Sequence, residues 1–246
     1  MNSTNHHAGR FANQFFISMA LHFISKKNNL KSSYLEYEQL KRLGIDLFIG
    51  ENTYEETIDL NDDIFFNYVL GLEENKQFNV LIKNDMWCQT AAFALYLKGY
   101  FDSREHKENI VNNNIFKEYY QNNNNLFVHV RLGDIIQLNY FTPFEYYDKV
   151  LSSHIFDKGY ISSDSIKHEM CQKLIDKYKL EIFDDEVVKT IMFGSTCKYI
   201  VLSSGTFSWM IGLLSFYSEE IYYPKIIRQW HGDIFIFPEW NEISDF

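Results

Sequence analysis

The chain has 246 residues, of which 46% are hydrophobic and 23% are charged, close to the averages of globular proteins. Its 23 Lys and Arg against 33 Asp and Glu give a formal net charge of −10. This acidic balance argues against broad nucleic-acid binding, which needs clustered positive charge. The length lies between one large domain and two small ones, and the composition excludes a disordered, collagen-like or coiled-coil chain.

Cysteine spacing and the lack of recognisable targeting patterns indicate in which cellular compartment we expect the protein. Cys88, Cys171 and Cys197 lie far apart and form no C-x-x-C pair, which argues against a disulfide framework and a four-ligand zinc site. The sequence contains no signal-peptide pattern and no apolar run of about 18 residues. We therefore expect a soluble, cytoplasmic protein with reduced cysteines, no transmembrane segment and no nucleic-acid partner.

Hydrophobic periodicity predicts three helices in the N-terminal half. The first is an amphipathic helix over residues 13–28, directly after Gly9-Arg10-Phe11-Ala12. A short helix over residues 36–44 ends at a glycine, and a buried helix is expected over residues 90–97. Residues 112–114 and 122–125 are rich in Asn and are predicted to be loops, the second of them a linker.

Strands alternate with helices in the C-terminal half. Short apolar runs predict strands over residues 126–130, 159–162, 199–202 and 220–223. Helical patterns fill the intervals, over residues 143–151, 166–178, 185–193 and 207–216. This alternation predicts βαβ units and a parallel sheet, and therefore an α/β fold.

Polar loops follow three of these predicted strands. The segment His129–Asp134 ends the first strand, Ser162–Asp164 the second, and Ser203–Trp209 the third. Ligands of open parallel sheets bind at the carboxyl ends of the strands, in the loops that lead to helices. The three loops therefore predict one binding site.

The residue types in these loops suit a phosphate group. Arg131 offers a planar fork of donors, and Ser204, Gly205 and Thr206 precede a helix, where free N–H groups attract anions. The sequence contains no phosphate-binding P-loop, no G-x-G-x-x-G after a strand and no D-x-D. These residues predict a nucleotide diphosphate held by arginine and backbone without metal.

Structural interpretations of the same residues stay open. Arg131 taken alone could form a structural ion pair, and the Ser/Thr-rich helix start could be only a cap. His129 alternates with two valines and could be a buried core histidine.

Six segments, taken in order, resemble motifs of the α-1,2-fucosyltransferase family (glycosyltransferase family 11-like). They span nearly the whole chain and are Gly9-Arg-Phe-Ala-Asn-Gln14, Gly99-Tyr-Phe-Asp-Ser103, His129-Val-Arg-Leu-Gly-Asp134, Pro143–Tyr147, Tyr160-Ile-Ser-Ser-Asp164 and Ser203-Ser-Gly-Thr-Phe-Ser-Trp209. The first and third are also similar to segments of protein O-fucosyltransferases. The chain departs from the α-1,2 family at Ala12, Leu132, Gly205 and Met210, where the family usually has Gly, Arg, Ser and Trp.

The resemblance implies a GT-B-like α/β fold of two Rossmann-type halves, whose parallel sheets face a cleft. Residues 1–121 would form the acceptor-side domain, and residues 122–246 the domain that binds the nucleotide sugar. The implied activity is inverting, metal-independent transfer of fucose from GDP-fucose to a glycan hydroxyl, with no cofactor.

Site residues follow from the same resemblance. The implied catalytic residues are Arg131, Asn13 and Asp134, with Asp134 either a weak candidate for the base or a partner that fixes Arg131. The implied donor-binding residues are Gly9, Arg10, His129, Arg131, Ser163, Asp164, Ser203, Ser204, Gly205, Thr206 and Phe207.

Two further functions remain open at this point. Leu132 motivates the first, in which the same scaffold uses another GDP-deoxysugar such as GDP-rhamnose. The short chain and the poor apolar strand before Gly9 motivate the second, a non-catalytic module that binds a glycan or a nucleotide. The sequence names neither the acceptor nor the linkage.

Overall fold

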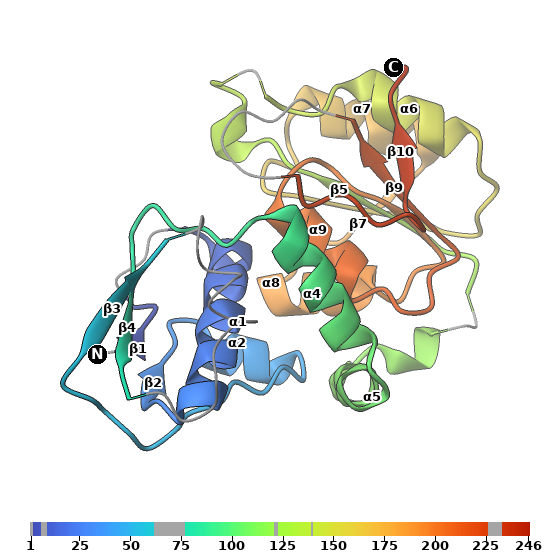
Figure 1. The fold of residues 1–246 in the computed structure, drawn as a ribbon. Helices are drawn as coiled ribbons and strands as arrows, with labels where there is room; N and C mark the ends of the chain where they lie inside the picture. The colour runs from blue at the N-terminus through green and yellow to red at the C-terminus, as the bar shows by residue number, and fades with distance from the viewer. Residues whose placement is uncertain (1, 6–8, 62–76, 121–122, 139, 226–232) are drawn as a thin grey trace. The chain divides into compact units, whose positions relative to one another are not determined.

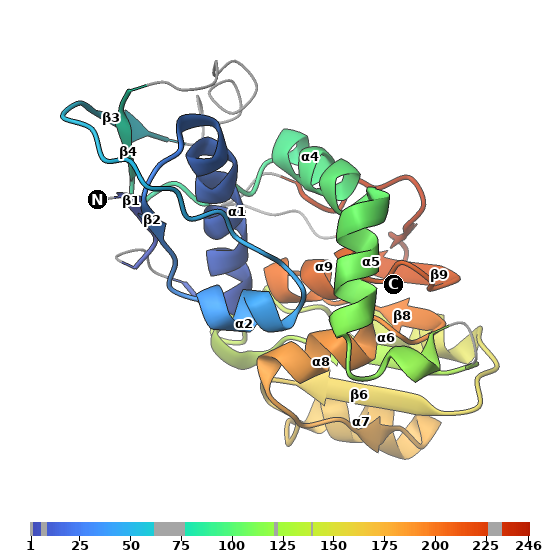
Figure 2. The ribbon, with the colours of Figure 1, turned by 90° about the horizontal axis from the view of Figure 1, so that it is seen from below.

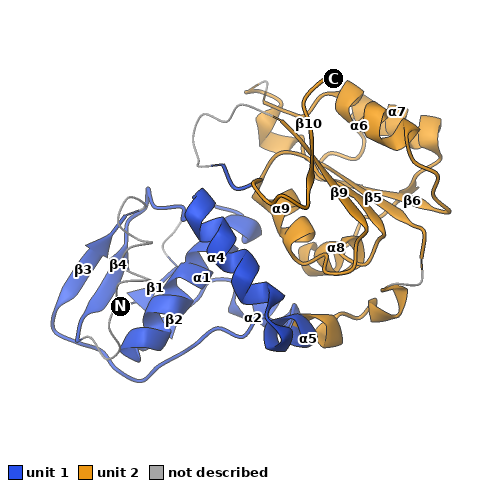
Figure 3. Ribbon diagram, turned by 45° about the vertical axis from the view of Figure 1, so that its right-hand side comes forward, with its two compact units in different colours: residues 1–109, 230–234 blue, residues 110–229, 235–246 orange. Residues whose placement is uncertain are grey.

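The structure is a computed structural model that describes residues 2–5, 9–61, 77–120, 123–138, 140–225 and 233–246. The chain forms two compact units (Figure 3). Unit 1 comprises residues 1–109 and 230–234, and unit 2 comprises residues 110–229 and 235–246. The predicted domain boundary, between residues 121 and 122, lies outside the described residues, as does the first residue of the predicted linker.

Unit 2 is built on a six-stranded sheet in which every described strand pairing is parallel. The strand order is β10-β9-β8-β5-β6-β7. The chain begins in the middle with β5, adds two strands on one side and then three on the other, which is the order of a Rossmann-type doubly wound sheet. The strands are β5 (Leu126–Val130), β6 (Gly159–Ser163), β7 (Glu181–Ile182), β8 (Tyr199–Val201), β9 (Glu220–Pro224) and β10 (Asn241–Ile243).

Helices cover both faces of this sheet (Figure 1). On one face lie α6 (Phe144–Ser152) and α7 (Glu169–Tyr178), and on the other lie α8 (Val187–Gly194) and α9 (Thr206–Leu213). All five residues of β5 are buried, as expected for a central parallel strand covered on both sides. The α/β fold with a parallel sheet is therefore confirmed.

Unit 1 contains short parallel strands and one long helix. Strand β1 pairs with β2, and β3 pairs with β4. Helix α1 lies between these strands and α4 (Figure 2), and the Phe16 and Phe93 rings, 6.5 Å apart, join the two helices. The elements are β1 (Asn2–Ser3), α1 (Phe11–Asn28), β2 (Ser32–Ser33), α2 (Tyr37–Arg42), β3 (Thr57–Leu60), β4 (Asn79–Ile82), α4 (Ala91–Asp102) and α5 (Arg104–Asn113).

A buried asparagine joins the two strand pairs of unit 1. The side chain of Asn2 is fully buried, and its Oδ1 accepts a hydrogen bond from the Val80 amide at 2.7 Å. Its Nδ2 donates to the carbonyl oxygen of Lys31 at 3.2 Å and to Oδ1 of Asn79 at 3.3 Å. The side chain of Asn2 therefore links β1 both to the residue before β2 and to β4.

Three sequence predictions differ from the structure. Helix α1 is not amphipathic, because it is covered on nearly all sides and most of its residues are buried. Asn112 and Asn113 form the last turn of α5 and not a loop. The strands β1 to β4, β7 and β10, together with α5, were not predicted. Across the described ranges, no helix is both long and apolar enough to cross a membrane.

Candidate ligand site at the carboxyl edge of the unit 2 sheet

The site lies where the strand order of unit 2 reverses. Strands β5 and β8 are neighbours in the sheet, although β6 and β7 separate them in sequence. The chain leaves these two strands toward opposite faces, and ligands of open α/β sheets bind outside the carboxyl ends at such a point. The structure brings the predicted segments together here, since the Arg131 amide donates to Oγ of Ser203 at 3.2 Å.

Arg131 packs against the backbone that precedes α9. Gly205 has φ of +123° and ψ of 159°, a conformation that only glycine adopts readily. A Cβ atom on Gly205 would lie 2.9 Å from Nη1 of Arg131. The guanidinium Nη2 donates to Asp134 Oδ1 at 3.2 Å, while the buried Nε has no hydrogen-bond partner among the described residues. The arginine side chain is 23% exposed.

The start of α9 is suited to an anion. Gly205 is its N-cap and supplies no side-chain cap, and the first turn contains no acidic residue. The N–H groups of the first turn point out of this end of the helix, and together with the helix dipole they give it a positive potential. Ser204 is fixed by a hydrogen bond from its amide to Oγ1 of Thr142 at 3.3 Å. Thr206, the first helical residue, is 8% exposed.

Asp164 positions the loop that carries Arg131. Its Oδ1 accepts hydrogen bonds from the amides of Leu132 at 2.8 Å and Gly133 at 3.0 Å. Gly133 lies so close to the carboxylate that an added Cβ would collide with it. Two oriented N–H donors on one carboxylate oxygen fix the turn after β5 relative to β6.

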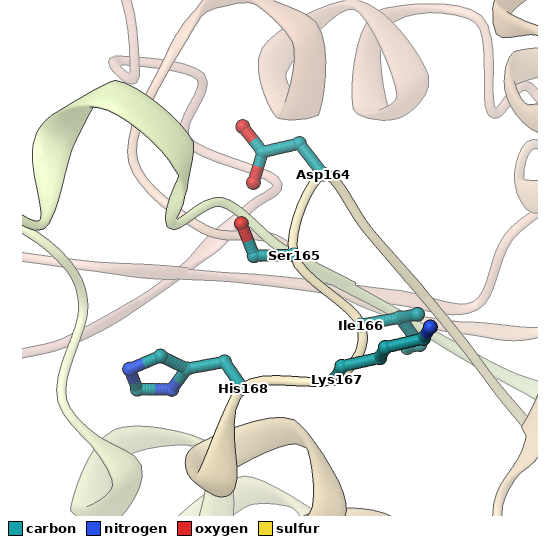
Figure 4. A pocket seen from close by; sticks show the side chains of 5 residues that line it. All are labelled: Asp164, Ser165, Ile166, Lys167 and His168. Atoms are coloured by element: carbon teal, nitrogen blue, oxygen red, sulfur yellow. The ribbon is translucent and has the colours of Figure 1, made fainter.

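A shallow hollow opens beside Asp164, in the loop between β6 and α7 (Figure 4). Residues 164–168 line it, and its volume is about 400 Å³. Within this loop, Oγ of Ser163 accepts a hydrogen bond from the Ser165 amide at 3.0 Å, and Nδ1 of His168 accepts one from the Met170 amide at 3.2 Å. Asp164 directly follows β6, and in Rossmann-type sites an acidic residue after the second strand contacts the ribose.

His129 is buried on β5, with only 6% of its surface exposed. Its Nδ1 lies 2.5 Å from Oγ of Ser208 and 3.2 Å from Oγ of Ser203, and its ring centroid is 4.9 Å from that of Phe207. Burial is the main cause that lowers its pKa to about 4, with Arg131 adding to the effect and Asp164 opposing it. The imidazole is therefore neutral at pH 7.

The remaining predicted residues belong to unit 1 and gather at the start of α1. Gly9 has φ of +110°, and Arg10 is the N-cap residue. Oδ1 of Asn13 accepts a hydrogen bond from Nε2 of Gln89 at 3.1 Å. A Cβ atom on Gly9 would lie 3.0 Å from the Trp87 ring.

Sequence reasoning left three site residues unassigned. Thr142 holds Ser204, and Ser208 contacts His129. Tyr146 is fully buried and donates from Oη to the carbonyl oxygen of Leu202, at 2.8 Å, where β8 ends. Tyr146 belongs to the segment Pro143–Tyr147 and Thr142 directly precedes it, while Ser208 lies within the segment that begins at Ser203, so the motifs were the available signal.

Leu132 has no exposed surface and packs in the core of unit 2. Among the residues that the structure describes, no group of three His, Cys, Asp or Glu side chains is placed to hold a metal ion. In comparisons with known proteins, no family model matches the chain and no curated protein matches it.

Proposed function

We propose that the protein is an inverting, metal-independent glycosyltransferase that moves fucose from GDP-fucose to a glycan hydroxyl. The observation that supports it is the placement of Arg131 against Gly205, directly before the uncapped start of α9. The ordered motifs that resemble fucosyltransferases contain both residues. A net charge of −10 means that local donors, and not a general positive field, would hold a diphosphate.

In this proposal the departing GDP is stabilised electrostatically. Negative charge develops on the β-phosphate as the bond to the sugar breaks, and oriented donors lower the energy of that state. Arg131 and the N–H groups of α9 supply those donors, with Ser204, Thr206 and Phe207 at the helix start. The nucleoside would occupy the hollow lined by residues 164–168.

The acceptor side has weaker candidates. Asp134 is exposed to 61% and pairs with Arg131, so it would hold the guanidinium in place, with general-base assistance as the alternative. A positioned base contributes about 10²–10⁴-fold to the rate of such a transfer. Gly9 and Arg10 are proposed to bind the donor, and Asn13 is proposed to lie near the transferred sugar.

The test measures GDP binding by calorimetry and sugar transfer from GDP-fucose, with and without EDTA. Arg131→Ala should weaken GDP binding by about 10–100-fold, because it removes a charge-assisted bidentate contact, and should abolish transfer. Arg104→Ala is the matched control, because Arg104 pairs with Glu108 on an exposed helix surface. A strict metal requirement, or unchanged GDP binding in Arg131→Ala, would contradict the proposal.

A second candidate keeps the scaffold and changes the donor to another GDP-deoxysugar such as GDP-rhamnose. The burial of Leu132 motivates it, because this side chain supplies neither charge nor hydrogen bond to the edge of the sheet. A panel of nucleotide sugars separates the two donors. A third candidate, a non-catalytic binding module, would bind GDP and transfer no sugar to any acceptor.

A further inference from the structure

Three side chains at the switch point form a closed set of hydrogen bonds. Nδ1 of His129 and Oγ of Ser208 lie 2.5 Å apart, and Oγ of Ser203 lies 2.7 Å from Oγ of Ser208. Both serines are almost completely buried. No solvent molecule is therefore needed to complete the set, and its protons can be counted.

Two backbone amides fix the direction of the bonds. The Arg131 amide donates to Oγ of Ser203, and the Ser203 amide donates to Oγ of Ser208, each at 3.2 Å. A hydroxyl has one proton to donate and two lone pairs to accept with. If Ser203 donates to Ser208 and Ser208 donates to His129, every proton in the set has an acceptor, and one lone pair of Ser203 stays unused. Nδ1 is then an acceptor, and the ring proton is on Nε2.

The opposite direction leaves a buried proton without an acceptor. If Nδ1 carried the proton and donated to Ser208, the Ser208 hydroxyl would donate to Ser203. Ser203 would then accept from Arg131 and Ser208, and its own proton would have no acceptor. The phenol of Tyr147 lies close enough to Ser203 for that hydroxyl to lower its pKa, against the larger effect of burial, which raises it. As placed in the structure, however, the phenol oxygen makes no hydrogen bond with any described residue and does not accept that proton. If both ring nitrogens of His129 carried protons, the hydroxyl proton of Ser203 would again have no acceptor.

We infer that Ser203 and Ser208 hold His129 as the neutral tautomer protonated at Nε2, so that it offers the ligand a hydrogen-bond donor and cannot act as a base. The tautomer follows from the structure alone, and the identity of the ligand rests on the proposed function. Within the described residues Nε2 has no hydrogen-bond partner. With Arg131 and the N–H groups of α9, the edge then presents donors, which suit an acceptor oxygen of a phosphate or a base carbonyl. Ser203 and Ser208 are positioning residues.

Nitrogen-15 NMR of histidine-labelled protein tests the tautomer directly. We expect Nδ1 to be unprotonated and Nε2 protonated between pH 5 and 8, a range in which the lowered pKa of His129 keeps the ring neutral. The His129→Gln spectrum assigns the signal, because it lacks one histidine. Ser208→Ala should shift the signal toward a mixture of tautomers. Ser215→Ala should not, because Ser215 bonds to Ile211 at the other end of α9.

GDP titrations test the donor. His129→Leu should bind GDP about 5–10-fold more weakly, the usual effect of one neutral hydrogen bond, whereas His129→Gln keeps an N–H donor and stays within about threefold of the wild type. A protonated Nδ1 at pH 7, or a pH dependence of affinity that disappears in His129→Gln, overturns the inference. A chain that binds no GDP but has the Nε2–H tautomer contradicts the proposed function and upholds the tautomer.

Discussion

The two units both contain parallel strands, but different interactions hold the strands in register. In unit 2 the central strand β5 is an apolar run buried on both faces, and it pairs with β6 and β8 through five and three residue pairs. In unit 1 the strands β1 and β2 have two residues each, and the side chain of Asn2 links them to β4. Apolar burial therefore fixes the sheet of unit 2, whereas satisfied polar groups join the two strand pairs of unit 1.

The largest expected effect comes from the apolar core of unit 2. Phe127 is fully buried, and its ring contacts Gly194 so closely that a Cβ there would lie 2.8 Å away. Phe127→Ala should lower the free energy of unfolding by about 3–5 kcal/mol, because it leaves a cavity. Urea denaturation measures the loss. Ile155→Ala, at a side chain that is 91% exposed, is the control, and equal effects in the two variants would contradict this account.

The dependence of stability on pH tests the burial of one histidine in each unit. The pKa values of His22 and His129 are lowered from 6.5 to about 4, mainly by burial. Unfolded imidazoles therefore bind protons near pH 6.5, whereas the folded ones do so only near pH 4. Stability is complete above pH 6.5 and should decrease by roughly 3 kcal/mol per histidine as the pH falls to 4.

Unfolding free energies measured between pH 7 and 4 test this prediction. His22→Asn should remove one histidine's share of the decrease, because its Oδ1 can replace Nδ1 as acceptor for the Phe48 amide. Carboxylates with lowered pKa values, Asp148 and Glu220, lose their contribution only at lower pH. A decrease that begins below pH 4 in the wild type would assign the effect to them.

The polar linkage of unit 1 gives a comparable effect without a cavity. Asn2→Leu keeps the volume but leaves the Val80 amide and the Lys31 carbonyl without their partner. We expect a loss of about 2–3 kcal/mol in the free energy of unfolding, since buried unpaired groups are costly. Asn112→Leu, on the exposed surface of α5, should change it little. If neither Asn2→Leu nor Asn112→Leu changed the free energy of unfolding, apolar burial would hold the strands of unit 1 as well as those of unit 2.

The smallest effect concerns a helix cap. Oγ1 of Thr90 accepts a hydrogen bond from the Phe93 amide at the start of α4. Thr90→Ala should cost about 1 kcal/mol and Thr90→Ser much less, because serine retains the acceptor. Thermal denaturation compares the two variants. An equal loss in both would assign the effect to the methyl group and not to the cap.

The central elements of unit 2 could be predicted from their apolar runs, whereas elements without such a run were missed. The bounds of β5 agree with the prediction, because five consecutive buried residues leave a clear pattern. Strand β7 has two exposed residues, and α5 buries only Ile110. Neither gives a hydrophobic period. Burial of α1 on nearly all sides depends on what packs around it, which its own periodicity does not specify.

The loops that form the candidate site could be predicted from the sequence, but the hydrogen bonds within it could not. The rule that ligands bind at strand ends placed Arg131, Asp164 and Ser204 at one edge, where the structure has them. The partners that fix them are Thr142 and Ser208, and the roles of these two hydroxyls depend on side-chain directions set by packing. Asp134 and Asp164 each follow a strand of the sheet, but their roles differ. Asp164 accepts hydrogen bonds from backbone amides, whereas Asp134 accepts one from the guanidinium of Arg131.

The strand order of unit 2 also has a consequence for folding. The hydrogen bond between His129 and Ser208 joins residues that are 79 positions apart, so it closes a long loop with a large entropic cost. A partly folded sheet of β5, β6 and β7 contains Arg131 and Asp164 but lacks the residues after β8. During refolding, ligand-binding capacity should therefore appear later than most secondary structure.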